Sequence, residues 1–95
     1  MTADAYLVSW NSLGRGHCAA YIELQAAEAC RDRNHGVMLP LRAAGIDKAS
    51  DALAWLVRYR SDDGATLQAV MLDRTPAQTA AARLHGMSMP LVVMG

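Results

Sequence analysis

A glycine-containing segment near the N-terminus holds the residue types best suited to chemistry in this sequence. It reads Gly14-Arg15-Gly16-His17-Cys18-Ala19, a G-x-G-x-x-A pattern, and follows an apolar run, Ala5–Trp10, that predicts a strand. Glycines let the backbone approach a phosphate group, and a helix beginning here would present its positive end to the same group. We therefore predict that any ligand site binds anions and is formed by Asn11, Ser12, Gly14, Arg15, Gly16 and His17.

The other parts of a dinucleotide-binding fingerprint are missing. Three residues separate the predicted strand from Gly14, and Arg42 follows the second apolar run, where an acidic partner for the ribose is expected. The chain is also too short for the two halves of that fold. A flexible turn that binds nothing therefore stays open as the alternative.

Cysteine and histidine side chains could bind a metal ion. The candidates are His17, Cys18, Cys30, His35 and His85, but their spacings match no common zinc site. If Gly16–Arg33 is one helix, Cys18 and Cys30 lie about 18 Å apart, too far for a disulfide. We expect two free thiols, no metal and no cofactor, as suits a reducing compartment.

The last third of the chain resembles the second half of a thioredoxin-like domain. An alanine-rich helix follows a strand ending at Asp73 and leads into Ser88-Met89-Pro90-Leu91-Val92-Val93. The resemblance implies that Pro90 is a cis proline opening a strand beside an active site. The C-x-x-C redox pair of that family is absent, so the resemblance implies a fold and not a redox activity.

The order of elements over residues 1–70 is similar to that of the small ferredoxin-like CRISPR-associated endonucleases and their toxin relatives. Those proteins dimerise through their sheets and place an acidic residue at the end of the first strand. Trp10 and Asn11 stand at that place here. The resemblance implies a ferredoxin-like α+β fold as an alternative, without the nuclease activity.

Apolar runs alternate with alanine-rich stretches at helical spacing along the whole chain. The predicted strands are Ala5–Trp10, Gly36–Leu41, Ala65–Asp73 and Met89–Met94, and the predicted helices are Gly16–Arg33, Asp47–Arg60 and Thr75–His85. Strands that alternate with helices are typical of α/β proteins. We predict one α/β domain over residues 1–95 in the order βαβαβαβ, with a four-stranded sheet packed by three helices. We find no internal repeat.

The composition of the chain limits the classes of partner that it can bind. The chain has 95 residues, is 53% hydrophobic, and carries a formal net charge of zero with a single Lys, Lys48. That charge argues against a general nucleic-acid binder. The N-terminus has no basic region followed by an apolar core, so we expect no signal peptide, and no run reaches the length of a membrane span. The low Lys content is typical of a GC-rich bacterial genome or a mobile element. We expect a cytoplasmic protein.

An apolar surplus in so small a chain predicts an exposed patch, and such patches mark contacts with partners or with a second copy. We expect a sheet edge to be open at Val37–Leu41 or Leu91–Met94. The function predicted from sequence is therefore a small binding or regulatory module that acts through protein-protein contacts, most simply as a homodimer. The alternative is a protein or enzyme that binds a small anion or nucleotide at residues 11–18. No catalytic residue is identified.

Overall fold

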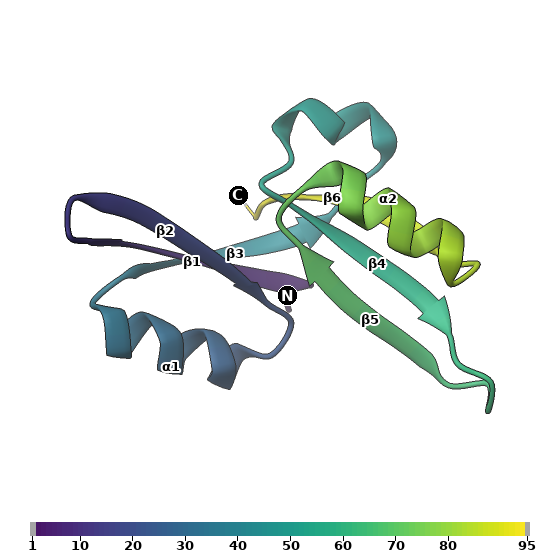
Figure 1. The fold of residues 1–95 in the computed structure, drawn as a ribbon, viewed down its shortest axis with the longest axis horizontal. Coiled ribbons are helices and arrows are strands. Elements are labelled where there is room, and N and C mark those ends of the chain that lie inside the picture. The colour runs from purple at the N-terminus through teal and green to yellow at the C-terminus, as the bar shows by residue number, and fades with distance from the viewer. Residues whose placement is uncertain (1, 95) are drawn as a thin grey trace.

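The fold is a single antiparallel sheet with helices against it. The computed structural model describes residues 2–94, and Figure 1 shows its elements. They are β1 (Ala5–Ser12), β2 (Arg15–Tyr21), α1 (Leu24–Asn34), β3 (Val37–Ala43), the 3₁₀ helix η1 (Ile46–Asp51), β4 (Ala54–Arg60), β5 (Thr66–Met71), α2 (Arg74–Arg83) and β6 (Met87–Val93). The strand order is β2-β1-β3-β6-β4-β5. The outermost strands, β2 and β5, come into contact, so the curled sheet approaches a closed barrel.

The predicted βαβαβαβ architecture is wrong. The sheet has six strands instead of four, and every pair of neighbours is antiparallel. The thioredoxin-like and ferredoxin-like alternatives do not describe this strand order either, and the peptide bond before Pro90 is trans. The strands expected at open edges, β3 and β6, are the two central ones.

The chain is an internal duplication, contrary to the expectation that it holds no repeat. Residues 4–44, the first unit, and residues 53–94, the second unit, each fold as ββαβ. The units align with an offset of 49 residues before the first turn of each and 50 residues after it. The second unit has one extra residue in its hairpin turn. Identical pairs are Ala5/Ala54, Leu7/Leu56, Val8/Val57, Ser12/Ser61, Gly14/Gly64, Ala19/Ala69, Ala27/Ala77, Arg33/Arg83, His35/His85, Gly36/Gly86, Pro40/Pro90 and Leu41/Leu91.

Backbone pairing repeats together with the sequence. β1 pairs with β3 from Ala5↔Leu41 onward, and β4 pairs with β6 from Ala54↔Leu91 onward. The two units meet where β3 pairs with β6 over three residue pairs centred on Arg42↔Val92. Because equivalent residues exchange places across this centre, the junction is self-complementary, like the interface of a two-fold dimer.

Pro40 and Pro90 limit this junction. Each lies in a central strand, so neither proline marks an open edge of the sheet. The Pro40 carbonyl accepts the Met94 N–H at 3.0 Å, and the Pro90 carbonyl accepts the Ala44 N–H at 2.9 Å. The missing N–H of each proline points to the same side, where the β3–β6 ladder stops. The prolines are tolerated because they stand at the two ends of the ladder.

Side chains on the two faces of the sheet form separate clusters. On one face, α1 covers Val8 in the first unit and α2 covers Val57 in the second. The helices approach closely because they bury small residues, Ala27 and Cys30 in α1, Ala77 and Ala81 in α2. On the other face, both units contribute to one cluster of buried residues: Ala5, Leu41, Ala54, Leu56 and Leu91. Part of the apolar surplus is therefore buried between the units of one chain.

The misplaced elements have physical reasons. Residues 54–57 of β4 are all buried because β4 is covered on both faces, so its apolar run lacks the alternation that marks a half-exposed strand. The predicted helix Asp47–Arg60 is instead η1 followed by β4. The predicted helix Gly16–Arg33 is β2 followed by α1, because β2 is an exposed edge strand with little apolar pattern. The predicted helix Thr75–His85 corresponds to α2.

Candidate functional site

The segment predicted to bind anions forms a β-hairpin. Asn11 and Ser12 end β1, and Arg15, Gly16 and His17 begin β2. α1 begins only at Leu24, so no helix N-terminus faces the two glycines. The structural premise of the dinucleotide-type interpretation is therefore wrong.

The turn of this hairpin is unusual for its sequence. Leu13 and Gly14 are its two central residues, both with positive φ, 53° and 76°. Two-residue turns of this kind favour Asn-Gly or Asp-Gly, because a bulky side chain is strained there. Leu13 nevertheless occupies the first position, and its side chain is 99% exposed. No contact within residues 2–94 explains a leucine at this place.

The second unit has an ordinary hairpin turn. Ser61, Asp62, Asp63 and Gly64 connect β4 to β5, and Gly64 takes the positive φ of 89°. The Ser61 hydroxyl donates to the Asp63 carboxylate, which also accepts the Ala65 N–H at 3.3 Å. These hydrogen bonds lower the pKa of Asp63. One hairpin tip is thus polar and bonded to itself, whereas the other presents an apolar side chain to solvent.

A groove of about 600 Å³ lies between the β1–β2 hairpin and the turn that leads from α1 into β3. We call it groove 1. Its lining residues are Ser9, Trp10, Asn11, Gly16, His17, Cys18, Asn34, His35, Gly36 and Val37. Three of the predicted site residues, Asn11, Gly16 and His17, line it. Ser12, Gly14 and Arg15 do not.

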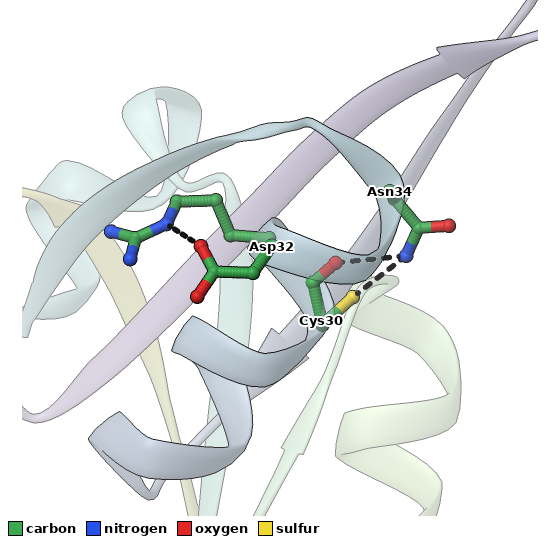
Figure 2. A network of polar contacts seen from close by, with 4 residues as sticks. Cys30, Asp32 and Asn34 are labelled. Carbon is green, nitrogen blue, oxygen red and sulfur yellow. Dashed lines mark hydrogen bonds and ion pairs between the residues drawn. The ribbon is translucent and has the colours of Figure 1, made fainter.

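The walls of groove 1 are aromatic and polar. The rings of Trp10 and His17 stack with centroids 5.6 Å apart and planes 21° apart. Across the groove, His35 caps α1 with a left-handed backbone, φ 53°. The Asn34 amide nitrogen donates to the Cys30 carbonyl at 2.9 Å and lies 3.5 Å from its sulfur. Figure 2 shows the Asn34 oxygen turned away from both, which leaves it free to accept a hydrogen bond.

The metal-ligand types do not converge. His17, Cys18 and His35 line groove 1. Cys30 is a buried residue of α1, and His85 belongs to the second unit. Within residues 2–94 no group of three or more His, Cys, Asp or Glu is arranged to hold a metal ion. Both cysteines are free thiols, although they lie on different elements and not on one predicted helix.

Cys30 affects one neighbouring group. Hydrogen bonding with its side chain, followed by burial, raises the pKa of the Tyr21 phenol. Tyr21 packs against the cluster that Cys30 forms with Val8 and Ala27. This contact belongs to the packing of the helix-covered face.

The second unit carries an equivalent groove of about 500 Å³, which we call groove 2. It lies between the β4–β5 hairpin and the C-terminal end of α2, and it is lined by Tyr59, Arg60, Ser61, Asp62, Arg83, Leu84 and His85. Tyr59 and His85 correspond to Trp10 and His35 of groove 1. His85 also has a left-handed backbone, φ 54°.

Sequence reasoning missed Leu13 and the whole of groove 2 as functional candidates, and it considered His35 only as a metal ligand. A signal for the two histidines was present in the repeated dipeptide His-Gly at residues 35–36 and 85–86, followed four residues after each glycine by proline and leucine. Nothing in the sequence marked Leu13, because its interest comes from its backbone conformation and exposure.

None of the three comparisons, with protein families, with curated proteins and with solved structures, finds a match for this chain. In the part of the chain that the structure describes, no helix combines the length and apolar character needed to cross a membrane.

Proposed function

We propose that this chain is a small binding module that acts through protein-protein contacts made by the β1–β2 hairpin, and that it pairs with a second copy of itself. The observation that carries the proposal is Leu13, fully exposed in a backbone conformation that disfavours it. Backbone strain persists where it serves a function, and an apolar side chain at a hairpin tip gains free energy only when a partner buries it.

The duplication supplies an internal control. At the equivalent hairpin the chain uses Asp62, Asp63 and Gly64, which satisfy their own turn. The fold therefore does not require a leucine at the tip. Other exposed apolar side chains, Val37 at 62% and Leu39 at 36%, lie on the strand that pairs with β1. They would widen an interface that starts at the hairpin.

The replacement Leu13→Asn tests the proposal. Burial of a leucine side chain is worth about 1.5–3 kcal/mol. Because each copy in the pair carries one Leu13, the variant should weaken self-association by about 100-fold or more. Asparagine suits the turn, so the variant stays folded. Sedimentation equilibrium over a range of concentrations measures the effect.

Ile46→Asn is the matched control, because Ile46 is 64% exposed but lies in η1, away from the hairpin. Its self-association should equal that of the unmodified chain. A chain that is monomeric at every concentration, or an Ile46→Asn variant as defective as Leu13→Asn, contradicts the proposal.

A small planar or anionic ligand in groove 1 is the second candidate function. The observation that favours it is the Trp10–His17 stack beside Asn11 and Gly16, all on the wall of one groove. Thermal shift with nucleotides, with His17→Ala as the comparison, tests it. A shift of the same size in the variant places the ligand elsewhere.

A further inference from the structure

The duplication allows a comparison of two units that share one framework. Most identical pairs have a structural cause. Leu7/Leu56, Val8/Val57, Ala27/Ala77 and Leu41/Leu91 belong to the buried clusters or pack against them. Gly36/Gly86 stand where a side chain would meet the backbone of the neighbouring strand. Gly14/Gly64 are exposed and take the positive φ of the two hairpin turns. Two identical pairs with larger side chains, Arg33/Arg83 and His35/His85, are also exposed.

The histidine pair occupies a backbone conformation that accepts this residue. His35 and His85 have φ values of 53° and 54°, a left-handed region that glycine and asparagine favour at the end of a helix and in which histidine is also enriched. Both units keep histidine, and each places it in the lining of its own groove.

Groove 2 gathers the retained side chains with a further cation. Arg83 and His85 line it together with Arg60, which replaces Asn11 of groove 1. Within residues 2–94 the one ion pair is Arg31–Asp32, so neither guanidinium of groove 2 is neutralised by a carboxylate. Asp62 is the one acidic residue in the lining.

The neighbouring acceptors are occupied. The carbonyls of Ala80, Ala81 and Ala82, at the end of α2, accept the N–H groups of Leu84, Gly86 and His85. Asp63 accepts from Ser61 and from the Ala65 N–H. The Asp62 carboxylate is the one charged acceptor in the lining, against two guanidinium groups and an imidazole beside the Tyr59 ring, so donors are in excess.

We propose that groove 2 is a binding site for a small molecule that bears a phosphate or carboxylate group. Arg60 and Arg83 would hold the oxyanion, because guanidinium groups match the geometry of both anions. His85, which lies with Arg83 at the end of α2, would donate to it as well. Groove 1 lacks an arginine in its lining and carries the Asn34 acceptor instead, so the two grooves differ in ligand.

The test is a titration of the full chain, followed by amide chemical shifts, with inorganic phosphate and separately with citrate, at constant ionic strength. We expect saturable shifts at Ser61, Arg83 and Gly86 at concentrations below about 10 mM. If only one anion gives saturable shifts, the site prefers that group, phosphate or carboxylate. If both do, the site recognises the negatively charged oxygens that the two groups share.

The variants Arg83→Gln and His85→Asn should each bind the anion more weakly, which raises the dissociation constant about tenfold. Asparagine tolerates the left-handed backbone, so the second variant keeps the turn. The matched controls are Arg33→Gln and His35→Asn in the first unit, which should leave that constant unchanged. Shifts that do not saturate, or an equal loss in the control variants, would overturn the proposal.

Discussion

Replacement of Gly36 or Gly86 by alanine should destabilise the fold strongly and to a similar extent. A Cβ at Gly36 would lie 2.5 Å from the Ser9 carbonyl oxygen and 3.1 Å from the Trp10 Cβ. A Cβ at Gly86 would collide with the Arg58 carbonyl oxygen and lie 2.8 Å from the Tyr59 Cβ. These contacts are equivalent in the two units, because each glycine lets β3 or β6 start beside its partner strand.

The magnitude follows from the atoms that are met. The nearest obstacle in each unit is a backbone carbonyl oxygen of the paired strand, Ser9 or Arg58. A backbone atom cannot rotate away as a flexible side chain could. Overpacking of this kind costs about 1–3 kcal/mol or more, and it outweighs the gain of about 0.4–1 kcal/mol that alanine brings by restricting the unfolded chain. In a chain of this size, each kcal/mol lowers the Tm by about 4–8 °C.

Urea unfolding of Gly36→Ala, Gly86→Ala and the control Gly16→Ala measures the effect. A Cβ at Gly16 would meet nothing closer than the Asn11 side-chain oxygen at 3.7 Å, and its φ is not positive. The control should therefore be neutral or slightly more stable. If Gly36→Ala unfolds at the same urea concentration as the unmodified chain, the reasoning about the paired units is refuted.

Further predictions concern the turns and the cysteines. Leu13→Asn should stabilise the isolated chain by about 1 kcal/mol, because asparagine adopts the left-handed region at lower cost than leucine; no gain in Tm would argue against the strained turn. Asp63 has a lowered pKa, so its ionised form stabilises the fold above about pH 4 and this contribution is lost as the pH falls through the folded-state value; Asp63→Asn should flatten the acid side of a Tm-against-pH curve, and an unchanged curve would contradict this. Cys30→Ala should cost about 1–3 kcal/mol because Cys30 is buried, whereas exposed Cys18→Ala should change stability by less than about 0.5 kcal/mol. Equal effects in calorimetry would contradict that placement.

Local patterns in the sequence predicted some elements and not their arrangement. The runs at β1, β3, β5 and β6 were recognisable because they are short and apolar, and α2 was recognisable from its alanine spacing. β4 was mistaken for a helix because both of its faces are buried, which removes the alternation of a strand. Most of β2 was predicted as part of a helix, because an exposed edge strand needs no apolar pattern.

Ligand binding by the predicted site residues stays a prediction, but the structure shows where they lie. Asn11, Gly16 and His17 do line a groove, but the physical reason first given, a helix N-terminus after the glycines, is wrong. The opposite wall at His35 could not be predicted, since it depends on the pairing of β1 with β3. The duplication was missed because only a minority of equivalent positions, such as Pro40 and Pro90, keep the same residue.

Contact between copies through the β1–β2 hairpin can be followed residue by residue with amide chemical shifts recorded at increasing protein concentration. We expect concentration-dependent shifts at Leu13, Gly14 and their neighbours in β1 and β2. We expect none at Asp62 and Asp63 in the equivalent hairpin. Shifts at the second hairpin of equal size, or spectra that do not change with concentration, would contradict the proposed contact.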